Sequence, residues 1–324
     1  MARHDVDFSR YRDVPTIFFR PYGHTILETA SHPPWEVPDK IAIIAAPTGA
    51  FYTKQQNPYQ PYTVEEIIRE AIESVEAGAC SVHVHVRDEN GFPSGDRKKT
   101  EAVVRALRER FGFAVHIDGE ALFGETFEEM MEPIVEDLYE SAAINCHATF
   151  FGDTISYLPP QTCKATVEVL HACGKKPLLA VYNPGDVDNT YRWLIRPGIV
   201  QPPFCWLVLA GMPGNAPMWD PLSMAETILY TIRRIRDVCS QERSVVTICA
   251  CGRASFYLVT LAILLGCHVR VGKEDTIYRL PHRDTVIVSN RETVEQTVAV
   301  ARMLGREPMT AQEYRELTGM RPLP

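Results

Sequence analysis

Short apolar runs alternate with amphipathic stretches from Lys40 to the end of the chain. The runs are Ile41–Ala46, Ser81–Val86, Ala114–Ile117, Ala142–Cys146, Pro177–Val181, Phe204–Leu209, Val245–Ala250 and Cys267–Val271, eight in all. Continuous apolar runs of this length are typical of strands that are buried on both faces of a parallel sheet. The pattern therefore predicts eight parallel strands.

Helical patterns fill the intervals between the runs. Four segments carry the spacing of a capping box, in which a Ser or Thr is followed three residues later by Glu. They begin at Thr63, Thr126, Ser223 and Thr310. Further helices are predicted over Thr100–Arg110, Leu158–Cys173, Val187–Arg196, Ser255–Leu265 and Thr293–Leu304. Strands and helices thus alternate along most of the chain.

Eight strand–helix units are compatible with a closed barrel or with an open doubly wound sheet. No Gly-x-Gly-x-x-Gly follows the first run, which argues against a dinucleotide-binding sheet. The chain has 324 residues, enough for a barrel of about 250 residues with extensions. We therefore expect a (β/α)8 TIM barrel over residues 39–324 that ends in a short C-terminal helix. Residues 1–38, which contain five prolines, are expected to form an N-terminal extended arm.

Charge and composition indicate which kinds of molecule the protein is expected to bind. The net charge of −8 argues against a nucleic-acid partner, because binding to phosphates needs clustered Lys and Arg. No apolar run is long enough to span a bilayer, and residues 1–13 lack the apolar core of a secretory signal. The nine cysteines are odd in number and form no Cys-x-x-Cys, as expected for reduced thiols in the cytoplasm. We expect a cytoplasmic protein that acts on a small molecule, without a membrane or nucleic-acid partner.

Catalytic groups of a TIM barrel lie at the carboxyl ends of its strands. The second run ends with His83 and His85, and side chains two apart in a strand point the same way, as would that of Arg87. The two histidines could be rim residues held by hydrogen bonds, but His-x-His at this position favours a metal site. Glu274, after the eighth run, could be a third ligand, and two His with one carboxylate is a pattern of catalytic zinc.

Other polar residues at the predicted strand ends are weaker candidates. Arg270 and Asp275 would share the rim with Glu274, as functional groups or as a salt bridge that caps the barrel. Asp118 and Glu120 follow the third run and could hold a cationic group or be rim residues. A third set comprises His116, His147, the pair Cys249 and Cys251, and the loop Gly211–Asn215. We expect the two cysteines to pack in their strand rather than bind a metal, and we expect the loop to form a simple turn rather than a phosphate site.

Two motifs taken together resemble the β-keto acid cleavage enzymes. They are Ala46–Ala50 with the segment that leads into His83–Asp88, and His268–Tyr278. The resemblance implies a zinc-dependent TIM barrel that condenses a β-keto acid with acetyl-CoA, giving acetoacetate and a new acyl-CoA. It implies that His83, His85 and Glu274 bind one zinc ion per subunit. It also implies that Arg270 and Asp275 form the catalytic pair, with Asp275 as the base. From fold-level analogy we expect a homo-oligomer.

The chain departs from that family's pattern around the substrate. Phe51 stands where the family has a glutamate, Asp118-Gly119-Glu120 replaces a small polar stretch, and Lys273 stands where an apolar residue is common. Ala180 stands where a glutamate is expected, and Ala148 offers no hydroxyl, although Thr149 is adjacent. The residues expected to bind substrate are Phe51, Arg87, Asp118, Glu120 and Thr149.

Phe51 argues for an apolar side chain, and against 3-keto-5-aminohexanoate as substrate. Asp118 and Glu120 would repel a substrate carboxylate unless Arg87, Lys273 or the zinc ion neutralises it. Two alternatives stay open: a metal-dependent hydrolase or lyase that acts on a small oxo acid without CoA, and a barrel that only binds a small ligand.

Overall fold

Eight parallel strands close into a barrel in this computed structural model, which describes residues 4–14, 34–151, 154–212, 220–240 and 243–320. The strands follow chain order around the barrel, and β13 pairs with β2 to close it. They are β2 (Ile43–Ala45), β3 (Ser81–His83), β6 (His116–Glu120), β7 (Ser141–Asn145), β10 (Lys176–Val181), β11 (Phe204–Ala210), β12 (Ser244–Ala250) and β13 (His268–Val271). The predicted (β/α)8 TIM barrel is confirmed.

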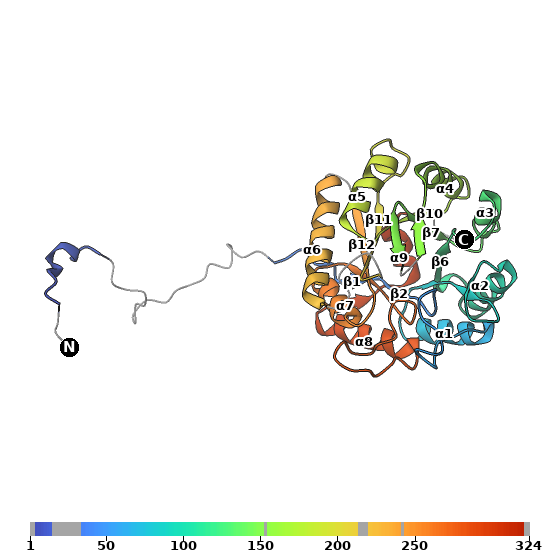
Figure 1. Ribbon diagram of the computed structural model, residues 1–324, viewed down its shortest axis with the longest axis horizontal. Helices are drawn as coiled ribbons and strands as arrows, with labels where there is room; N and C mark the ends of the chain where they lie inside the picture. Colours follow the sequence, from blue (N-terminus) through green and yellow to red (C-terminus); the bar gives the residue numbers. More distant parts are fainter. Residues whose placement is uncertain (1–3, 15–33, 152–153, 213–219, 241–242, 321–324) are drawn as a thin grey trace. The chain divides into compact units, whose positions relative to one another are not determined.

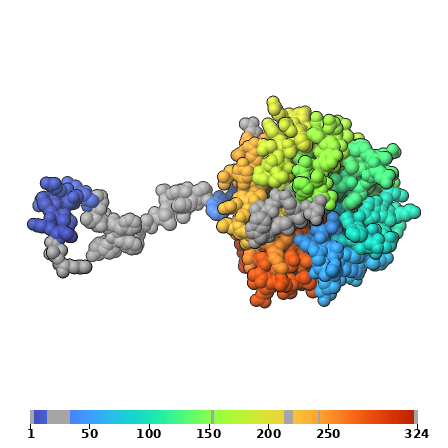
Figure 2. All heavy atoms as spheres, in the orientation of Figure 1, coloured from blue at the N-terminus to red at the C-terminus, as the bar shows by residue number. Residues whose placement is uncertain are grey.

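Except for the last, the helices surround the barrel in the same order, as the succession of colours in Figures 1 and 2 shows. They are α1 (Val64–Glu76), α2 (Arg97–Phe111), α3 (Phe127–Val135), α4 (Pro160–Ala172), α5 (Pro184–Thr190), α6 (Pro221–Val238), α7 (Ser255–Leu264), α8 (Asn290–Met303) and α9 (Ala311–Thr318). Capping boxes begin α1, α3 and α9 at Thr63, Thr126 and Thr310, as predicted. The prediction for Ser223 was wrong, because Asp220 caps α6 and Pro221 takes its first position.

Two apolar runs are divided between the barrel and short outer strands. Ile41 belongs to β1 (Lys40–Ile41), which pairs with β14 (Glu307–Pro308) outside the barrel. In the second run β3 ends at His83, and β4 (Val86–Arg87) pairs antiparallel with β5 (Pro93–Ser94). The side chains of His83, His85 and Arg87 therefore do not belong to one continuous strand, and their directions follow from the bend between β3 and β4.

The barrel interior is closed at its amino-terminal end by α9. Tyr314 of this helix lies inside the barrel, with its ring 5.1 Å from that of His116. His116 begins β6 rather than ending it, and its ring nitrogens contact Ser81 Oγ at 2.7 Å and Ser141 Oγ at 3.3 Å. The sequence-based placement of His116 at a carboxyl strand end was therefore wrong.

A buried ion pair fastens α9 to the barrel. The guanidinium of Arg315 donates to both carboxylate oxygens of Glu140, at 2.7 and 2.9 Å, and to the carbonyl oxygens of Phe113 and Val115. Arg108 donates to the same carboxylate at 2.6 Å. Burial opposes ionisation of Glu140, but the two arginines outweigh it and lower its pKa to about 2.

The segment that precedes the barrel is a separate unit. Residue contacts divide the chain between Glu36 and Val37, two residues before the boundary expected from the sequence. Among its described residues one turn of 3-10 helix, η1 (Phe8–Tyr11), begins at Asp7, whose side chain accepts from the backbone amide of Ser9. Throughout the described ranges, no helix combines the length and apolar character needed to cross a membrane.

Replacing Arg315 with Met should lower the free energy of unfolding by about 3 kcal/mol, because it leaves the carboxylate of Glu140 buried with one partner fewer. Urea denaturation measures this change. The matched control is Arg110→Met, because Arg110 pairs with Glu76 at the surface and such pairs contribute at most about 1 kcal/mol. Equal effects of the two substitutions would contradict the role given to Arg315.

Candidate metal and catalytic site

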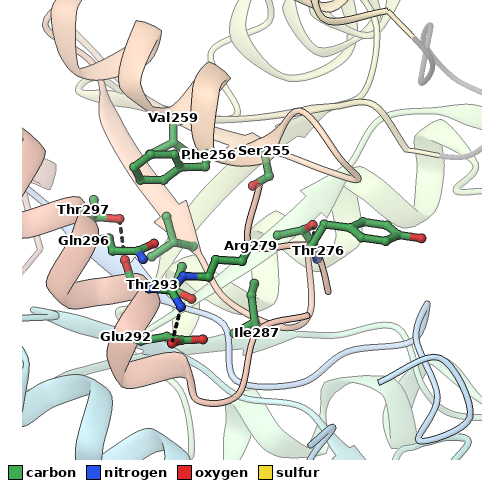
Figure 3. A pocket seen from close by; sticks show the side chains of 12 residues that line it. Ser255, Phe256, Val259, Thr276, Arg279, Ile287, Glu292, Thr293, Gln296 and Thr297 are labelled. Carbon is green, nitrogen blue, oxygen red and sulfur yellow. Dashed lines mark hydrogen bonds and ion pairs between the residues drawn. The ribbon is translucent and has the colours of Figure 1, made fainter. Parts of the chain in front are cut away.

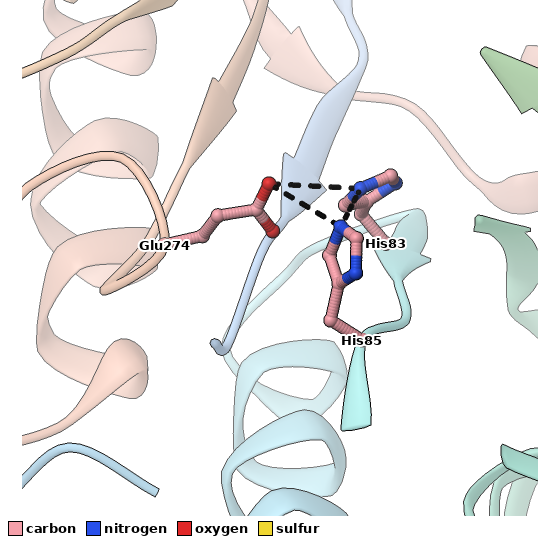
Figure 4. A group of neighbouring side chains, drawn as sticks. All are labelled: His83, His85 and Glu274. Carbon is pink, nitrogen blue, oxygen red and sulfur yellow. Dashed lines mark hydrogen bonds and ion pairs between the residues drawn. The ribbon is translucent and has the colours of Figure 1, made fainter. Parts of the chain in front are cut away.

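Three side chains converge at the carboxyl end of the barrel. His83 ends β3, His85 follows in the bend before β4, and Glu274 lies in the loop after β13. The Nε2 atoms of the two histidines are 3.0 Å apart, and each lies 3.7 Å from Oε1 of Glu274. Figure 4 shows the three side chains pointing toward one another. β13, β2 and β3 are neighbours in the barrel, so closure of the barrel brings residues 83 and 274 together.

The donor set fits a metal ion. Ligand atoms in tetrahedral zinc sites lie about 2.0–2.2 Å from the ion, so they are separated by roughly 3.3–3.5 Å. The separations of 3.0 and 3.7 Å bracket this value, and all three residues are buried or nearly so. Asp118 Oδ2 lies 2.8 Å from Nδ1 of His83, an arrangement that favours a proton on Nδ1 and leaves Nε2 as the ligand atom. The other oxygen of Glu274, Oε2, is buried and has no hydrogen-bond partner among the described residues.

The electrostatics of this site also favour a cation. Burial raises the pKa of Glu274 to about 7. Burial alone would lower the pKa of His83, but the carboxylates of Glu274 and Asp118 outweigh it and raise that pKa to about 9. Burial, and then the charge of His83, lower the pKa of His85. Buried carboxylates outnumber the cations near them, an imbalance that a bound divalent cation would reduce.

Arg270 and Asp275 form a buried ion pair beside this cluster. The Nη2 atom of Arg270, on β13, donates to Asp275 Oδ1 at 2.6 Å and lies 3.1 Å from Glu274 Oε1. Burial disfavours the charge on Arg270, but the carboxylates of Asp275 and Glu274 raise its pKa above the usual value. Oδ2 of Asp275 is buried and accepts no hydrogen bond from the residues that the structure describes. One carboxylate oxygen is therefore held and the other is available to accept a proton.

Two glycines allow the loop that carries Glu274 to pass close to β2. Gly272 has φ +149°, and a Cβ there would overlap the backbone of Ala46. A Cβ on Gly49 would overlap the side chain of Glu274. The backbone amide of Glu274 donates to the carbonyl oxygen of Ala46 at 3.1 Å. Side chains at these two positions would displace Glu274 from the histidines.

Lys273 points away from the candidate site. Its ammonium group is fully buried, donates to Glu70 Oε1 at 2.9 Å and also donates to the carbonyl oxygens of Tyr59 and Val288. The other oxygen of Glu70 accepts from the backbone and side-chain amides of Asn290. The sequence left open that Lys273 neutralises a substrate carboxylate, but its direction excludes this role. Lys273 instead ties the loop of Glu274 to α1 and to the start of α8.

Arg87 and Asp118, two of the five residues expected to bind substrate, are engaged by the protein. Arg87 donates to Thr48 Oγ1 at 2.7 Å and to the carbonyl oxygens of Gly91 and Tyr52. Asp118 lies behind His83, where its two oxygens contact the imidazole and the hydroxyl of Ser81. Both side chains thus support the site from outside rather than extend into it.

Glu120 reaches the edge of the candidate metal cluster, the group formed by the side chains of His83, His85 and Glu274. One of its oxygens is 3.9 Å from His85 Nε2, and burial raises its pKa. Phe51 is half-buried, and its ring lies 5.8 Å from that of Phe151. Thr149 lies in β8 (Ala148–Phe151), which forms a hairpin with β9 (Thr154–Tyr157), and it faces the same side of that hairpin as Phe151. Of the five, Asp118 and Glu120 lie next to the histidines, Asp118 behind His83 and Glu120 beside the Nε2 atom of His85.

Apolar side chains cover the half of the barrel mouth away from the histidines. This apolar wall consists of Ala143, Ala180, Tyr182, Leu207, Leu209, Met212, Cys249 and Cys251, with Phe51 and Phe151 packed against them. Its members come mainly from the carboxyl halves of β7, β10, β11 and β12, whereas the metal cluster lies on β3 and β13. The wall follows strand order, and the sequence signal for it is the apolar character of the carboxyl halves of these strands, where Asn145 of β7 is the polar exception.

Several other candidates lie in or beside this wall. The sulfur atoms of Cys249 and Cys251 are 3.8 Å apart, and together with an oxygen of Asp275 they lie within 4.8 Å of one another. His147 packs its ring 4.5 Å from that of Tyr182, and burial lowers its pKa to about 4. Sequence reasoning missed Asn145, which ends β7 and accepts from the hydroxyl of Tyr182. Within the loop Gly211–Asn215, residues 213–215 lie outside the described residues.

A separate small hollow lies between α7, α8 and the segment after β13 (Figure 3). Its polar side chains are engaged with one another: Arg279 lies 3.9 Å from Glu292, and Thr297 donates to the carbonyl oxygen of Thr293. It shares no residue with the metal cluster. We therefore place the functional site at the barrel mouth.

Comparisons with known proteins agree with this geometry. The sequence profile of the beta-keto acid cleavage enzyme family matches residues 40–320. A 3-keto-5-aminohexanoate cleavage enzyme from Fusobacterium nucleatum is 34% identical over 285 residues, which cover 87% of this chain and 99% of that protein. A 3-dehydrocarnitine:acetyl-CoA trimethylamine transferase from Rhizobium meliloti is 24% identical over 299 residues, covering 85% of this chain and 95% of that protein.

A solved structure shows the same fold. The binary complex of ObcA with oxaloacetate superposes with a TM-score of 0.66 at 21% identity, covering 82% of this chain and 68% of that chain. At this identity the likeness concerns the barrel alone. The profile match and the relative at 34% identity, by contrast, each extend over most of the chain. This chain therefore belongs to the β-keto acid cleavage enzyme family.

Proposed function

We propose that this protein is a zinc-dependent β-keto acid cleavage enzyme that converts a β-keto acid and acetyl-CoA into acetoacetate and a new acyl-CoA. The observation that carries the proposal is the pairing of two arrangements at one barrel mouth. One is the triad of His83, His85 and Glu274, and the other is the ion pair of Arg270 and Asp275 beside it. Relatives whose names include acetyl-CoA as co-substrate support the choice of that thioester.

Asp275 is the proposed base. The hydrogens on C2 of a β-keto acid are acidic because the neighbouring carbonyl delocalises the charge that their loss creates. Arg270 holds Oδ1 of Asp275 at 2.6 Å, so the carboxylate has a defined orientation, and Oδ2 can accept the proton. Zinc held by His83, His85 and Glu274 would act as a Lewis acid that polarises the keto oxygen.

The atoms balance without a further reactant. C2 of the keto acid forms a bond with the acetyl carbonyl carbon, and the bond between that carbon and the CoA sulfur breaks. The bond between C2 and C3 of the keto acid then breaks, and the freed CoA sulfur becomes bonded to C3. The products are acetoacetate and a thioester of the remaining acyl group. Asp275 accepts the proton from C2 at the start and can return it to that carbon when the bond to C3 breaks.

Side-chain chemistry argues against an amino-bearing substrate. Phe51 stands among apolar side chains, and Ala180 offers no carboxylate. Asp118 is paired with His83 rather than open to a ligand, and Glu120 lies at the edge of the metal cluster. We also propose one zinc ion per subunit, a homo-oligomeric state and a cytoplasmic location, in keeping with the sequence.

The proposal is tested by incubating zinc-loaded protein with a panel of β-keto acids, with and without acetyl-CoA. Acetoacetate should form only when acetyl-CoA is present. Loss of the keto acid without acetyl-CoA would favour the hydrolase or lyase alternative instead.

Replacing His83 with Ala should reduce bound zinc from about one ion per subunit to a small fraction, because removing one of three ligands weakens binding strongly. Elemental analysis of the purified protein measures this. His171→Ala, on the exposed face of α4, is the matched control and should keep its zinc. Unchanged zinc content in both variants would exclude His83 as a ligand.

Replacing Asp275 with Asn should reduce kcat at least about 1,000-fold and leave the zinc content intact, because the amide keeps the shape of the side chain but cannot accept a proton. Steady-state kinetics and elemental analysis on the same sample separate the two effects. Asp284→Asn removes an exposed carboxylate that pairs with Arg253 and should leave kcat unchanged. Full activity of the Asp275 variant would end its assignment as the base.

Apparent zinc affinity should rise as pH increases from 6 to 8. Zinc competes with protons, because the pKa of Glu274 is about 7 and that of His83 about 9 before the ion binds. Below these pKa values each ligand proton must be displaced, which weakens binding by about tenfold per pH unit for each proton. Competition with a chelator at pH 6, 7 and 8 measures this, and a pH-independent affinity would contradict the ligand assignment.

A further inference from the structure

We propose that the substrate carries an uncharged, apolar acyl side chain, aliphatic or aromatic, that packs against the apolar wall at Phe51, Phe151 and Tyr182. The inference rests on the proposed function and specifies its substrate class. It goes beyond the identity of residue 51, because it depends on how side chains from several strands are arranged around the base.

The apolar wall begins directly at the catalytic ion pair. Nη2 of Arg270 donates to the sulfur atom of Cys249 at 3.5 Å and to Asp275 at 2.6 Å. Cys251 adjoins Cys249, and the hydroxyl of Tyr52, next to Phe51, contacts the carbonyl oxygen of Asp275 at 3.5 Å. A keto acid whose C2 lies at Asp275 and whose carboxylate and keto oxygen lie on the charged side extends its acyl group in the opposite direction, onto the wall.

The wall itself contains no Asp, Glu, Lys, Arg or His among its described residues, and Glu120, whose charge acts on Tyr182, faces His85 at 3.9 Å. The hydroxyl of Tyr182 is already bonded to Asn145, and His147 is neutral at physiological pH because burial lowers its pKa to about 4. Arg270 and Asp275 lie at the edge of the wall and are paired with each other. An ammonium or carboxylate group buried there would lose its hydration without gaining a partner, at a cost of several kcal/mol.

The aromatic rings do not form a cage for a quaternary ammonium group either. Such a cage surrounds the cation with ring faces. Here the rings pack on one another, with centroids 5.8 Å apart for Phe51 and Phe151 and 5.1 Å apart for Phe151 and Tyr182. The Phe51–Phe151 contact is edge-to-face and the Phe151–Tyr182 contact is tilted, so the rings form an apolar surface. A branched alkyl or phenyl group complements that surface.

The test compares four β-keto acids that differ in the acyl side chain: 3-oxo-5-methylhexanoate, 3-oxo-5-aminohexanoate, 3-oxoadipate and 4-trimethylammonio-3-oxobutanoate. Each is assayed with zinc-loaded enzyme and acetyl-CoA, and acetoacetate is measured. The acid with an uncharged side chain, 3-oxo-5-methylhexanoate, should have a kcat/KM roughly 100-fold above that of each acid with a charged side chain. Only the uncharged side chain can be buried without leaving a charge unpaired. A charged acid that equals or exceeds it would overturn the inference.

Binding to the Asp275→Asn variant separates this inference from the proposed function. Calorimetric titration of the zinc-loaded variant with the same four acids needs no turnover. Tighter binding of 3-oxo-5-methylhexanoate supports the inference even if no acid yields acetoacetate, an outcome that would overturn the proposed function alone. Preferred binding of a charged acid would overturn the inference whatever the turnover.

Substitutions in the wall add a matched comparison. Phe51→Glu should lower the preference for the neutral acid over 3-oxo-5-aminohexanoate by at least tenfold, and Phe51→Leu should keep it. Phe150→Glu places the same charge on the exposed face of the β8–β9 hairpin and should leave the preference unchanged. An equal shift in the Phe51→Glu and Phe150→Glu variants would show that a general change of charge, and not the wall, determines the preference, and would overturn the inference.

Discussion

The need to hold four carboxylates close together away from water governs the architecture of the barrel mouth. Asp118, Glu120, Glu274 and Asp275 are largely buried there, and Arg270 is the cation that lies among them. Buried charges of one sign are tolerated only when each has a partner. Asp275 is partnered by Arg270, and Asp118 by the imidazole of His83, which leaves Glu274 with a raised pKa between the two histidines. The proposed zinc ion supplies the positive charge that this arrangement lacks.

Such an arrangement needs a rigid loop after β13, and a second buried ion pair provides it. Lys273 points to the opposite side of the loop from its neighbour Glu274 and binds Glu70 of α1, while its backbone amide donates to the side chain of Asn290. Asn290 in turn donates to the carbonyl oxygen of Pro47, at the end of the β2 segment. Adjacent residues thus have different roles: Lys273 fixes the backbone of the loop, and the side chains of Glu274 and Asp275 extend into the barrel mouth. An apolar residue at position 273 would fill the same space but would lack the three hydrogen bonds of the Lys273 ammonium group.

The sequence was sufficient to predict the barrel and the proximity of the three residues of the candidate metal cluster, because both follow from periodicity and strand order. Parallel strands bring their carboxyl ends to one rim, so His83, His85 and Glu274 could be expected to meet before any coordinates were known. The roles of Arg87, Asp118 and Lys273 could not be derived in this way. Each was read as a charge that faces the substrate, whereas each is satisfied by a partner distant in sequence, namely Thr48, His83 and Glu70. Strand alternation gives the side of a side chain but not its partner, and for buried charges the partner determines the role. The starts of two helices were likewise missed, because Asp96 caps α2 four residues before Thr100, and Asp220 caps α6 three residues before Ser223.

The division of the mouth into a charged half and an apolar half follows from the barrel itself. β13, β2, β3 and β6 are consecutive around it, and the ionisable groups lie on or directly after β3, β6 and β13, whereas β7, β10, β11 and β12 carry apolar ones. Apolar side chains next to Arg270 and Asp275 exclude water, and exclusion of water strengthens the attraction within that pair. The same side chains make the apolar half a poor environment for any second charge. For the proposed substrate, which has a charged head and a neutral tail, this division favours one orientation at the mouth, in which the carbon between its two carbonyl groups would lie next to Asp275.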